Sequence, residues 1–460
     1  MSTPLLGRYR QTRPSEGKTG AGPSPARCDA GRLAAACHSY FARYECNGDM
    51  QATRLAASDP KRTFPLNVCP MKSAGRTGSV RPASTLKERR FRYAITPPVA
   101  SAVPVWLNGL KYKAGCLRKR KARNQARAAH GGNQMATLLR APKHVVRTPA
   151  VDSRRWDQFE PRDGDIVIGT FAKCGTTWTQ RIVDLLVFQS PDVRPFAEIS
   201  PWLDSTIFNA IEDDLATLKA QTHRRYIKSH LPFDALPVWD NVKYIHVGRD
   251  GRDARLSWQN HEQGFNPEFA AHVAAQAMAL AAERGETPAG PPPPAPDDPR
   301  EYLIQWFEQL EAQCDGSGPT RFGLQFLGFE ATYWHERHRP NLLFVHYNDL
   351  KEDLTGEMRR ISEFLDIATP ESLMPSLVEA ARFETMKKDG DALFPKLQKV
   401  FDRGADRFIN QGRSGRWREY LKAEDIARYE AIMERACTPG LAGWLEGGRR
   451  IAGDPKSSRD

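Results

Sequence analysis

Hydrophobic positions in the last two thirds of the chain follow two patterns that alternate. Largely apolar runs occur at residues 166–168, 244–247 and 341–347, and such runs are typical of strands that are buried on both faces. Apolar residues recur every three or four positions from 178 to 188 and from 348 to 365, which predicts a helix after the first and the third run. Strands that alternate with helices favour an α/β fold with a doubly wound parallel sheet.

The turn between the first strand and its helix combines several features of an anion-binding site. It reads Ala-Lys-Cys-Gly-Thr-Thr over residues 172–177. The free backbone N–H groups and the dipole of the following helix favour negative charge there, Lys173 adds a full positive charge, and the threonines add hydroxyl donors. The lysine precedes the glycine, so the order differs from the nucleotide-triphosphate loop GxxxxGK[ST]. We expect a phosphate at this P-loop-like turn; an ordinary strand-to-helix turn that carries a lysine is the alternative.

Two further segments carry candidate chemistry. Lys228 and His230 alternate in a predicted extended segment that ends at a Leu-Pro pair, so both side chains point to the same side. Arg249 and Ser257 are eight residues apart, at a turn and about two helical turns further along the chain. A guanidinium and a hydroxyl at that spacing can reach one phosphate, with the guanidinium contributing paired donors. A surface network of the arginines and aspartates in the same turn is the alternative.

The order of these segments resembles that of the cytosolic-type sulfotransferases, which use 3′-phosphoadenosine 5′-phosphosulfate (PAPS). The turn at 172–177 is similar to their phosphosulfate loop, residues 228–232 to their KxHLP element, and the Arg…Ser pair to their 3′-phosphate segment. The resemblance covers roughly residues 149–445. It implies a single catalytic domain that transfers a sulfuryl group from PAPS to a hydroxyl or amine of a small apolar acceptor by in-line displacement.

The resemblance also implies roles for individual residues. His230 would be the general base, Lys173 would stabilise charge on the oxygen of the departing phosphate, and Lys228 would hold the phosphosulfate. No metal is implied, because no cluster of His, Cys and carboxylate residues has ligand spacing. The residues expected to contact PAPS or its product PAP are Lys173, Cys174, Gly175, Thr176, Thr177, Trp178, Arg249, Ser257, Tyr347, Phe383, Gly412 and Arg413.

Two segments depart from the family pattern. Residues 381–388, which resemble the family's TSFxxMK segment, have Ala381 and Arg382 in place of Thr-Ser. Residues 408–417 resemble the RKGxxGxW element that clamps the 3′-phosphate, but have Asn-Gln at 410–411 in place of Arg-Lys. Another cation must therefore replace the missing charge, and we expect Arg413 to do so because it is adjacent.

The acceptor side of the protein is less well defined by the sequence. Residues 262–328 contain an alanine-rich helical pattern at 269–283 and four consecutive prolines at 291–294, which form a stiff spacer. The resemblance implies that this segment is an insertion that acts as a lid over the acceptor pocket. Trp202 and Phe208 lie in a proline-containing apolar segment that either lines the same pocket or is a plain surface loop.

Charge divides the chain near residue 134. The whole sequence carries +12, whereas residues 1–134 hold 25 Lys and Arg against 6 Asp and Glu, or +19, so the remainder carries −7. The first part shows no sustained hydrophobic period and is rich in Arg, Ser, Pro, Ala and Gly, which predicts a disordered extension to a catalytic domain at 135–460. Three interpretations of this extension stay open: an arm that binds nucleic acid or an anionic membrane, a solvated tail, or upstream sequence translated from a misplaced start. The third rests on Met135, which opens the predicted folded region.

Cysteine usage and hydropathy favour a cytoplasmic protein without a membrane span. Five of the eight cysteines lie in the first part with no zinc-site spacing, and the other three are far apart, so we expect a reducing compartment. The start of the chain lacks the apolar core of a secretory signal, and prolines interrupt the most apolar window at 93–110. Two other functions stay open: a P-loop nucleotide kinase or NTPase, and a nucleic-acid-binding protein that acts through the basic arm.

Overall fold

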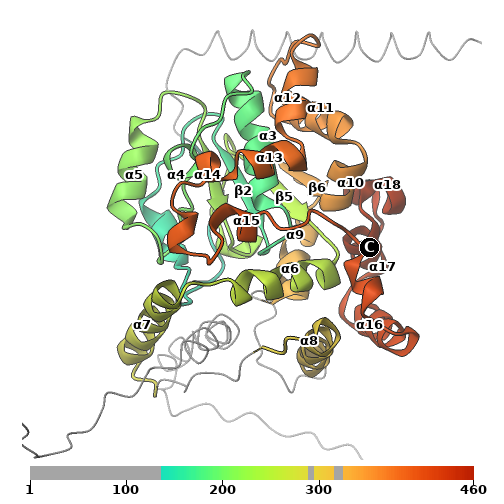
Figure 1. Ribbon diagram of the computed structural model, residues 1–460. Coiled ribbons are helices and arrows are strands. Elements are labelled where there is room, and N and C mark those ends of the chain that lie inside the picture. Colours follow the sequence, from blue (N-terminus) through green and yellow to red (C-terminus); the bar gives the residue numbers. More distant parts are fainter. Residues whose placement is uncertain (1–135, 288–294, 315–324) are drawn as a thin grey trace, which may run out of the picture. The chain divides into compact units, whose positions relative to one another are not determined.

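A computed structural model describes residues 136–460 apart from 288–294 and 315–324 (Figure 1). The predictions made above for residues 1–134, and for the proline run at 291–294, therefore lie outside the described residues.

Four parallel strands form the central sheet in the order β3-β2-β5-β6 (Figure 1). The strands are β3 (Tyr226–Ser229), β2 (Ile166–Thr170), β5 (Lys243–Gly248) and β6 (Leu342–His346). In the register, Ile168 of β2 lies between Lys228 of β3 and Ile245 of β5. All three predicted apolar runs are therefore strands of one parallel sheet, which confirms the expected α/β fold. A separate antiparallel pair joins β1 (Leu138–Arg140) to β4 (Val238–Trp239).

Both faces of the sheet are buried, which explains why its strands are apolar without alternation. Ile166 and Ile168 belong to one hydrophobic cluster, whereas Val167 between them belongs to the other. The first cluster packs against α3 (Thr176–Phe188), α11 (Leu354–Phe364) and α12 (Met374–Ala380). The second includes side chains of α6 (Gly251–Gln263), α8 (Pro299–Cys314), α9 (Phe326–His335), α16 (Ala423–Ala436) and α17 (Pro439–Gly447).

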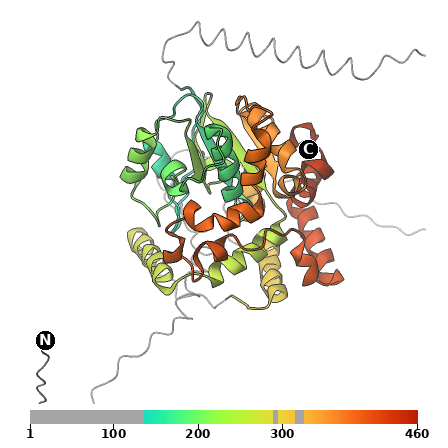
Figure 2. The same cartoon turned by 45° about the horizontal axis from the view of Figure 1, so that its top comes forward.

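Shorter elements complete the described part of the chain. In Figures 1 and 2, α16, α17 and α18 lie on the right, which is the side of β6 in Figure 1, and α7 lies on the left, away from them. The remaining helices are α4 (Phe196–Ile199), α5 (Ile211–Ala220), α7 (Pro267–Arg284), α10 (Tyr347–Glu352), α13 (Phe383–Lys388), α14 (Gly390–Leu393), α15 (Gly404–Phe408) and α18 (Arg449–Ala452). The 3-10 turns are η2 (Ser153–Gln158), η3 (Phe233–Ala235), η5 (Leu397–Lys399), η6 (Arg416–Glu419) and η7 (Pro455–Ser457).

The helices agree with the hydrophobic periods except in one place. The period from 178 to 188 is α3, and the alanine-rich pattern at 269–283 is α7. The prediction of one helix over 348–365 is wrong, because α10 ends and α11 begins at Asp353. The Asp353 side chain accepts a hydrogen bond from the Gly356 backbone N–H at 2.8 Å, so it caps a new helix instead of continuing the old one.

Close packing beneath the sheet holds the carboxyl ends of the strands in place. Gly169 of β2 lies against Tyr333 of α9, and a Cβ at this position would be 2.1 Å from the phenol oxygen. The same hydroxyl donates a hydrogen bond to the Leu231 carbonyl at 3.1 Å. A side chain larger than hydrogen at Gly169 would therefore displace the tyrosine that ties the end of β3 to α9.

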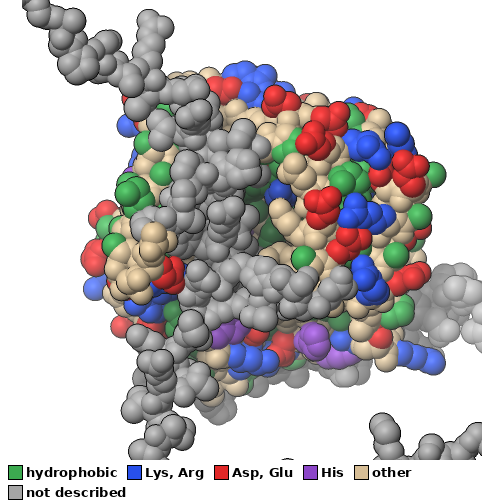
Figure 3. Space-filling model, turned by 90° about the horizontal axis from the view of Figure 1, so that it is seen from below, with side chains coloured by type: hydrophobic (Ala, Val, Ile, Leu, Met, Phe, Trp, Pro, Cys, Tyr) green, Lys and Arg blue, Asp and Glu red, His purple; other side chains and the backbone are tan. Residues whose placement is uncertain are grey.

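One face of the molecule and the hydropathy of the helices bear on its surroundings. On the face seen from below, acidic and basic side chains are interspersed where the described residues are visible (Figure 3). Within the described ranges, no helix is both long enough and apolar enough to span a bilayer.

Candidate active site

The turn after β2 has a backbone that few residues adopt. Lys173 has φ 67° and Gly175 has φ 114°, both in the left-handed region, and α3 begins at the next residue. A Cβ at Gly175 would also lie 3.1 Å from the ring of Tyr347, so only glycine fits there without a shift. The first amide groups of α3 thus open towards the cavity that Lys173 enters.

Two lysines enter this cavity without an acidic partner. Lys173 Nζ lies 3.3 Å from His261 Nδ1 and 4.7 Å from the centre of the Phe408 ring. Lys228 Nζ lies 4.1 Å from the centre of the Trp202 ring. Neither ammonium forms an ion pair with any residue that the structure describes. Two cations so placed lack a counter-charge, which an anionic ligand can supply.

Burial lowers the pKa of both lysines. Desolvation, and then the charges of Arg249 and Lys228, lower the pKa of Lys173 to about 7. Desolvation lowers the pKa of Lys228 to about 8, against the opposing attraction of Asp204. Both ammonium groups are therefore close to losing their protons near neutral pH unless an anion binds beside them.

His230 is held as a neutral base at the end of β3. Its Nδ1 lies 2.7 Å from the Thr170 carbonyl oxygen, which can only accept, so Nδ1 carries the proton and Nε2 keeps its lone pair. The ring meets Trp202 edge-on at 4.9 Å. Burial, and then the charge of Lys228, lower the pKa of His230 to about 3. Asp204 fixes the backbone by accepting from the His230 N–H at 3.0 Å.

A second histidine, His261 of α6, contacts Lys173 and was not expected from the sequence. His261 lies on α6 one turn beyond Ser257, and its Nδ1 accepts from the lysine, so its proton is on Nε2. Burial, and then Lys173, keep the pKa of His261 well below its usual range. His261 is four residues after Ser257, so both side chains lie on one face of the helix. This spacing is visible in the sequence and would have indicated His261 as a site residue.

Arg249 joins the turn after β2 to a loop far along the chain. Its guanidinium donates to the Lys173 carbonyl and to the Arg413 carbonyl, each at 3.0 Å, and it lies 4.1 Å from the centre of the Tyr347 ring. Its Nε is buried and has no partner among the described residues. The turn at 172–177 and the Arg249 region are therefore neighbours.

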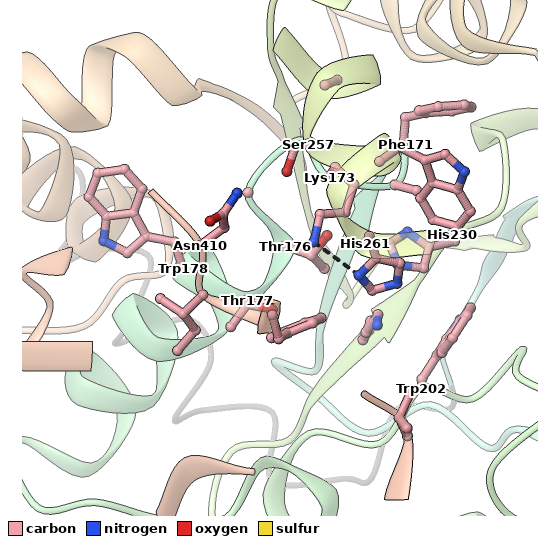
Figure 4. A pocket seen from close by; sticks show the side chains of 18 of the residues that line it. Phe171, Lys173, Thr176, Thr177, Trp178, Trp202, His230, Ser257, His261 and Asn410 are labelled. Atoms are coloured by element: carbon pink, nitrogen blue, oxygen red, sulfur yellow. Dashed lines mark hydrogen bonds between the residues drawn. The ribbon is translucent and has the colours of Figure 1, made fainter. Parts of the chain in front are cut away.

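One cavity of about 1000 Å³ brings the predicted residues together. In the view of Figure 4, Trp178 and Asn410 lie to one side of Lys173, with His230 and Trp202 to the other. The predicted residues that line the cavity are Lys173, Gly175, Thr176, Thr177, Trp178, Lys228, His230, Arg249, Ser257, Tyr347, Phe383, Gly412 and Arg413.

Cys174 is the predicted residue whose side chain stays outside the cavity. It is fully buried beneath the turn, with Sγ 3.8 Å from the Ala172 carbonyl. Burial raises the pKa of the thiol well above its usual value, so it is not a nucleophile. Only its backbone can contribute to an anion site.

The loop at 410–413 lies within reach of several cations. The Arg413 side chain is 56% exposed and forms an ion pair with Glu419. Lys351 Nζ donates to the Gly412 carbonyl at 2.6 Å, and Lys387 Nζ donates to the Asn410 carbonyl at 3.2 Å. Burial, and then the nearby Arg249, lower the pKa of Lys351. Lys351, which the sequence reasoning did not consider, is thus a cation close to Arg249.

The other end of the cavity is aromatic. Phe171 meets Phe326 and Phe329 edge-on at 5.3 and 5.4 Å. Trp202 and Phe208 line the same cavity, so their segment is not a plain surface loop. Side chains from α7 and α8, within the segment 262–328, also form part of the wall.

Known proteins with a similar sequence carry sulfotransferase names. A family model described as a sulfotransferase domain matches residues 163–440. The glycolipid sulfotransferase of Mycobacterium bovis (strain BCG / Pasteur 1173P2) is 36% identical over 318 residues, which span 66% of this chain and 95% of that protein. Sulfotransferase 1B1 of Canis lupus familiaris is 25% identical over 300 residues, 63% of this chain and 89% of that protein. The crystal structure of mouse sulfotransferase SULT7A1 complexed with PAP matches with a TM-score of 0.46 at 18% identity, over 67% of this chain and 98% of that chain.

Proposed function

This chain belongs to the sulfotransferase family, and on that premise we propose how its cavity carries out PAPS-dependent sulfuryl transfer. The reaction moves the sulfuryl group of PAPS to an acceptor and leaves PAP. Neither a nucleotide kinase or NTPase nor a nucleic-acid-binding protein is favoured, since the family match covers more than half of the chain.

The residues of the cavity suit a donor with two phosphate groups. Lys173, Lys228 and the first amides of α3 bind the 5′-phosphosulfate end, while Arg249 and Ser257 bind the 3′-phosphate. The fit is supported by the two lysines that lack an acidic partner and by the buried, unpartnered Nε of Arg249. Lys351 supplies the charge that the loop at 410–413 lacks, because Glu419 already neutralises Arg413.

His230 acts as the general base. Its Nε2 takes the proton of the acceptor hydroxyl as that oxygen attacks sulfur, and the Thr170 carbonyl holds the opposite N–H throughout. In the empty cavity, burial and two nearby ammonium groups depress the basicity of the ring. Anionic phosphates beside Lys173 and Lys228 offset that repulsion, so the ring becomes a stronger base when the donor is bound.

Lys173 acts at the other end of the breaking bond. Its ammonium stabilises the charge that develops on the bridging oxygen as the bond from that oxygen to sulfur breaks. The hydrogen bond to His261 positions the ammonium within the turn, whose left-handed backbone aims the side chain into the cavity.

The acceptor has a hydroxyl group on a partly apolar molecule. The aromatic wall around Phe171, Trp202 and Phe208 buries an apolar portion, and no metal is needed to activate a hydroxyl beside a neutral histidine. The relative that is 36% identical carries the name glycolipid sulfotransferase. We therefore extend the proposal to an amphiphilic acceptor of glycolipid type.

The observation that carries the proposal is one cavity that holds a neutral histidine and two lysines without an ion-pair partner among the described residues. The test is transfer of labelled sulfate from PAPS to a panel of alcohols, phenols and glycolipids by the wild-type protein. His230→Gln should reduce turnover on the order of 10² or more, with the Kd of PAP within about twofold of wild type. His223→Gln is the matched control, because this histidine lies outside the cavity.

Two results would contradict this assignment. Near-normal turnover in His230→Gln would remove the base role from that residue. Stabilisation by ATP equal to that by PAP in a thermal-shift assay would contradict a site built for a 3′-phosphate and would favour a kinase.

A further inference from the structure

Helix α8 presents three kinds of side chain on three faces. Its apolar face packs into the core through Tyr302, Leu303, Trp306, Phe307 and Leu310. Its acidic residues, Glu301, Glu308 and Glu311, lie on the opposite side at the helical period. Between these faces runs a row of three glutamines at positions i, i+4 and i+8, namely Gln305, Gln309 and Gln313, here called the amide row.

The amide row faces the active-site cavity. All three glutamines line it, together with Ala312 of the same helix and Gln325 just before α9. Gln313 donates a hydrogen bond to Gln325. None of the three α8 glutamates lines the cavity. The wall formed by α8, which also includes Trp306, is therefore uncharged and places amides beside an indole.

Two members of the row keep their hydrogen-bonding capacity for a ligand. Within the described ranges, the side chains of Gln305 and Gln309 form no hydrogen bond. Gln180, which lines the same cavity, is buried and donates to Ser200 Oγ at 2.8 Å, whereas Gln305 and Gln309 are exposed. Both amides therefore face open space at the α8 end of the cavity, where a ligand can take the place of water.

Aromatic contacts connect the amide row to the reacting end. Trp306, next to Gln305, meets Phe326 edge-on at 5.9 Å, and Phe326 meets Phe171 at 5.3 Å. Phe171 is two residues before Lys173. A ligand that touches the row therefore lies along these rings, within the same cavity as Lys173 and His230.

An uncharged amide row beside aromatic rings matches the chemistry of a saccharide. A carboxamide both donates and accepts, as a sugar hydroxyl does, and it repels neither neutral nor charged neighbours. Aromatic faces pack against the apolar C–H face of a pyranose ring. We propose that the amide row is a saccharide subsite, which binds the sugar portion of the acceptor while an apolar chain occupies the remaining aromatic wall. The inference rests on the proposed function, since it assigns the acceptor half of that site.

The test uses binding and needs no turnover. The protein is saturated with PAP, and the Kd values of monomeric octyl β-glucoside and of 1-octanol are measured by titration calorimetry. Wild type should bind the glucoside about tenfold or more tightly than octanol, since each hydrogen bond to a neutral partner contributes a few-fold in affinity. Gln305→Ala combined with Gln309→Ala should weaken glucoside binding about tenfold and leave octanol binding unchanged.

Glu308→Ala is the matched control, because Glu308 lies on the same helix but outside the cavity. It should leave both Kd values unchanged. Alanine is the best helix former, so the glutamine variants keep α8, and an unchanged Kd for PAP confirms an intact donor site.

The outcomes separate this inference from the proposed function. Equal binding of both ligands by wild type, or equal weakening of both in the double variant, overturns the saccharide subsite. A selective loss of glucoside binding supports it even if no acceptor is sulfated, in which case only the proposed function fails. Sulfation of alkyl alcohols without any preference for glucosides leaves the function standing and overturns the subsite.

Discussion

The protonation state of Lys173 makes a quantitative prediction about donor binding. Burial, and then the charges of Arg249 and Lys228, lower the pKa of this lysine to about 7 in the empty cavity. The phosphates of PAP favour the ammonium form, so the pKa of Lys173 is higher in the complex than in the free protein. Binding then takes up a proton above pH 7, and affinity must fall as the pH rises.

The size of the effect follows from that pKa. With a free-protein pKa of about 7, half of the molecules carry the ammonium at pH 7 and about one in a hundred at pH 9, so the Kd of PAP should rise about 50-fold over these two units. About one pH unit below this pKa nearly every molecule carries the ammonium, and the contribution of Lys173 to the slope disappears. The ligand's own phosphates titrate at about pH 6, outside this window. Lys228, whose pKa is lowered to about 8, steepens the decline above pH 8.

Titration calorimetry of PAP from pH 6.5 to 9 measures this directly. Two buffers of different ionisation enthalpy at each pH report the number of protons taken up. Near pH 8 we expect about 0.9 from Lys173 and about 0.5 from Lys228. Lys173→Arg should flatten the profile between pH 7 and 8, because a guanidinium stays charged throughout. Lys219→Arg on the exposed face of α5 is the matched control and should behave as wild type.

His261 provides an independent check of the same reasoning. Its Nδ1 accepts a hydrogen bond from the ammonium, which favours the charged lysine. His261→Phe removes that acceptor, so the Kd of PAP should begin to rise at a lower pH than in wild type. A Kd that varies by less than twofold between pH 7 and 9, or an equal rise in Lys173→Arg, would refute the role given to the lysine.

Three further predictions concern binding and stability. Arg249→Ala should weaken PAP about 100-fold but adenosine 5′-phosphate only a few-fold, since charge-assisted contacts to the 3′-phosphate are lost; equal losses by calorimetry would contradict this. Lys351→Met should weaken PAP about tenfold and Arg413→Met by about twofold or less, and the reverse order would return the 3′-phosphate role to the arginine. Gly169→Ala should lower the free energy of unfolding by about 1–3 kcal/mol in urea, because the new methyl group overlaps the Tyr333 hydroxyl. Tyr333→Phe in that background should then recover part of the loss.

The donor half of the cavity could be predicted because its parts are local in sequence. A strand, a turn and a helix within residues 166–188 place Lys173 and the amides of α3 together, whatever else packs around them. The alternation of Lys228 and His230 likewise puts both on one side of an extended segment, and both line the cavity. Such relations depend on backbone geometry alone, so the sequence determines them.

Relations that depend on packing between distant segments could not be predicted in this way. Nearness in sequence favours Arg413, but Glu419 pairs with its side chain. Lys351, which is 61 residues before Gly412, reaches the same loop. The helix predicted over 348–365 is divided because Asp353 caps α11. The spacing of hydrophobic residues does not reveal such a polar cap. The roles of Arg249 and of the other predicted site residues remain predictions until binding is measured.

The same distinction explains why the acceptor half could be assigned only from the structure. Its walls come from the turn after β2, from α7, from α8 and from the start of α9, which are far apart in the sequence. Aromatic contacts of Phe326 join α9 to Phe171 and to Trp306 of α8. In the sequence, three glutamines at helical spacing among acidic residues are typical of a solvated face; the cavity beside them is what distinguishes the amide row. Because α8 contributes no residue to the donor turn, changes in Gln305 or Gln309 should alter acceptor choice while the Kd of PAP stays constant. Because different elements form the donor half and the acceptor half of the cavity, the acceptor can change without loss of the sulfuryl-transfer chemistry.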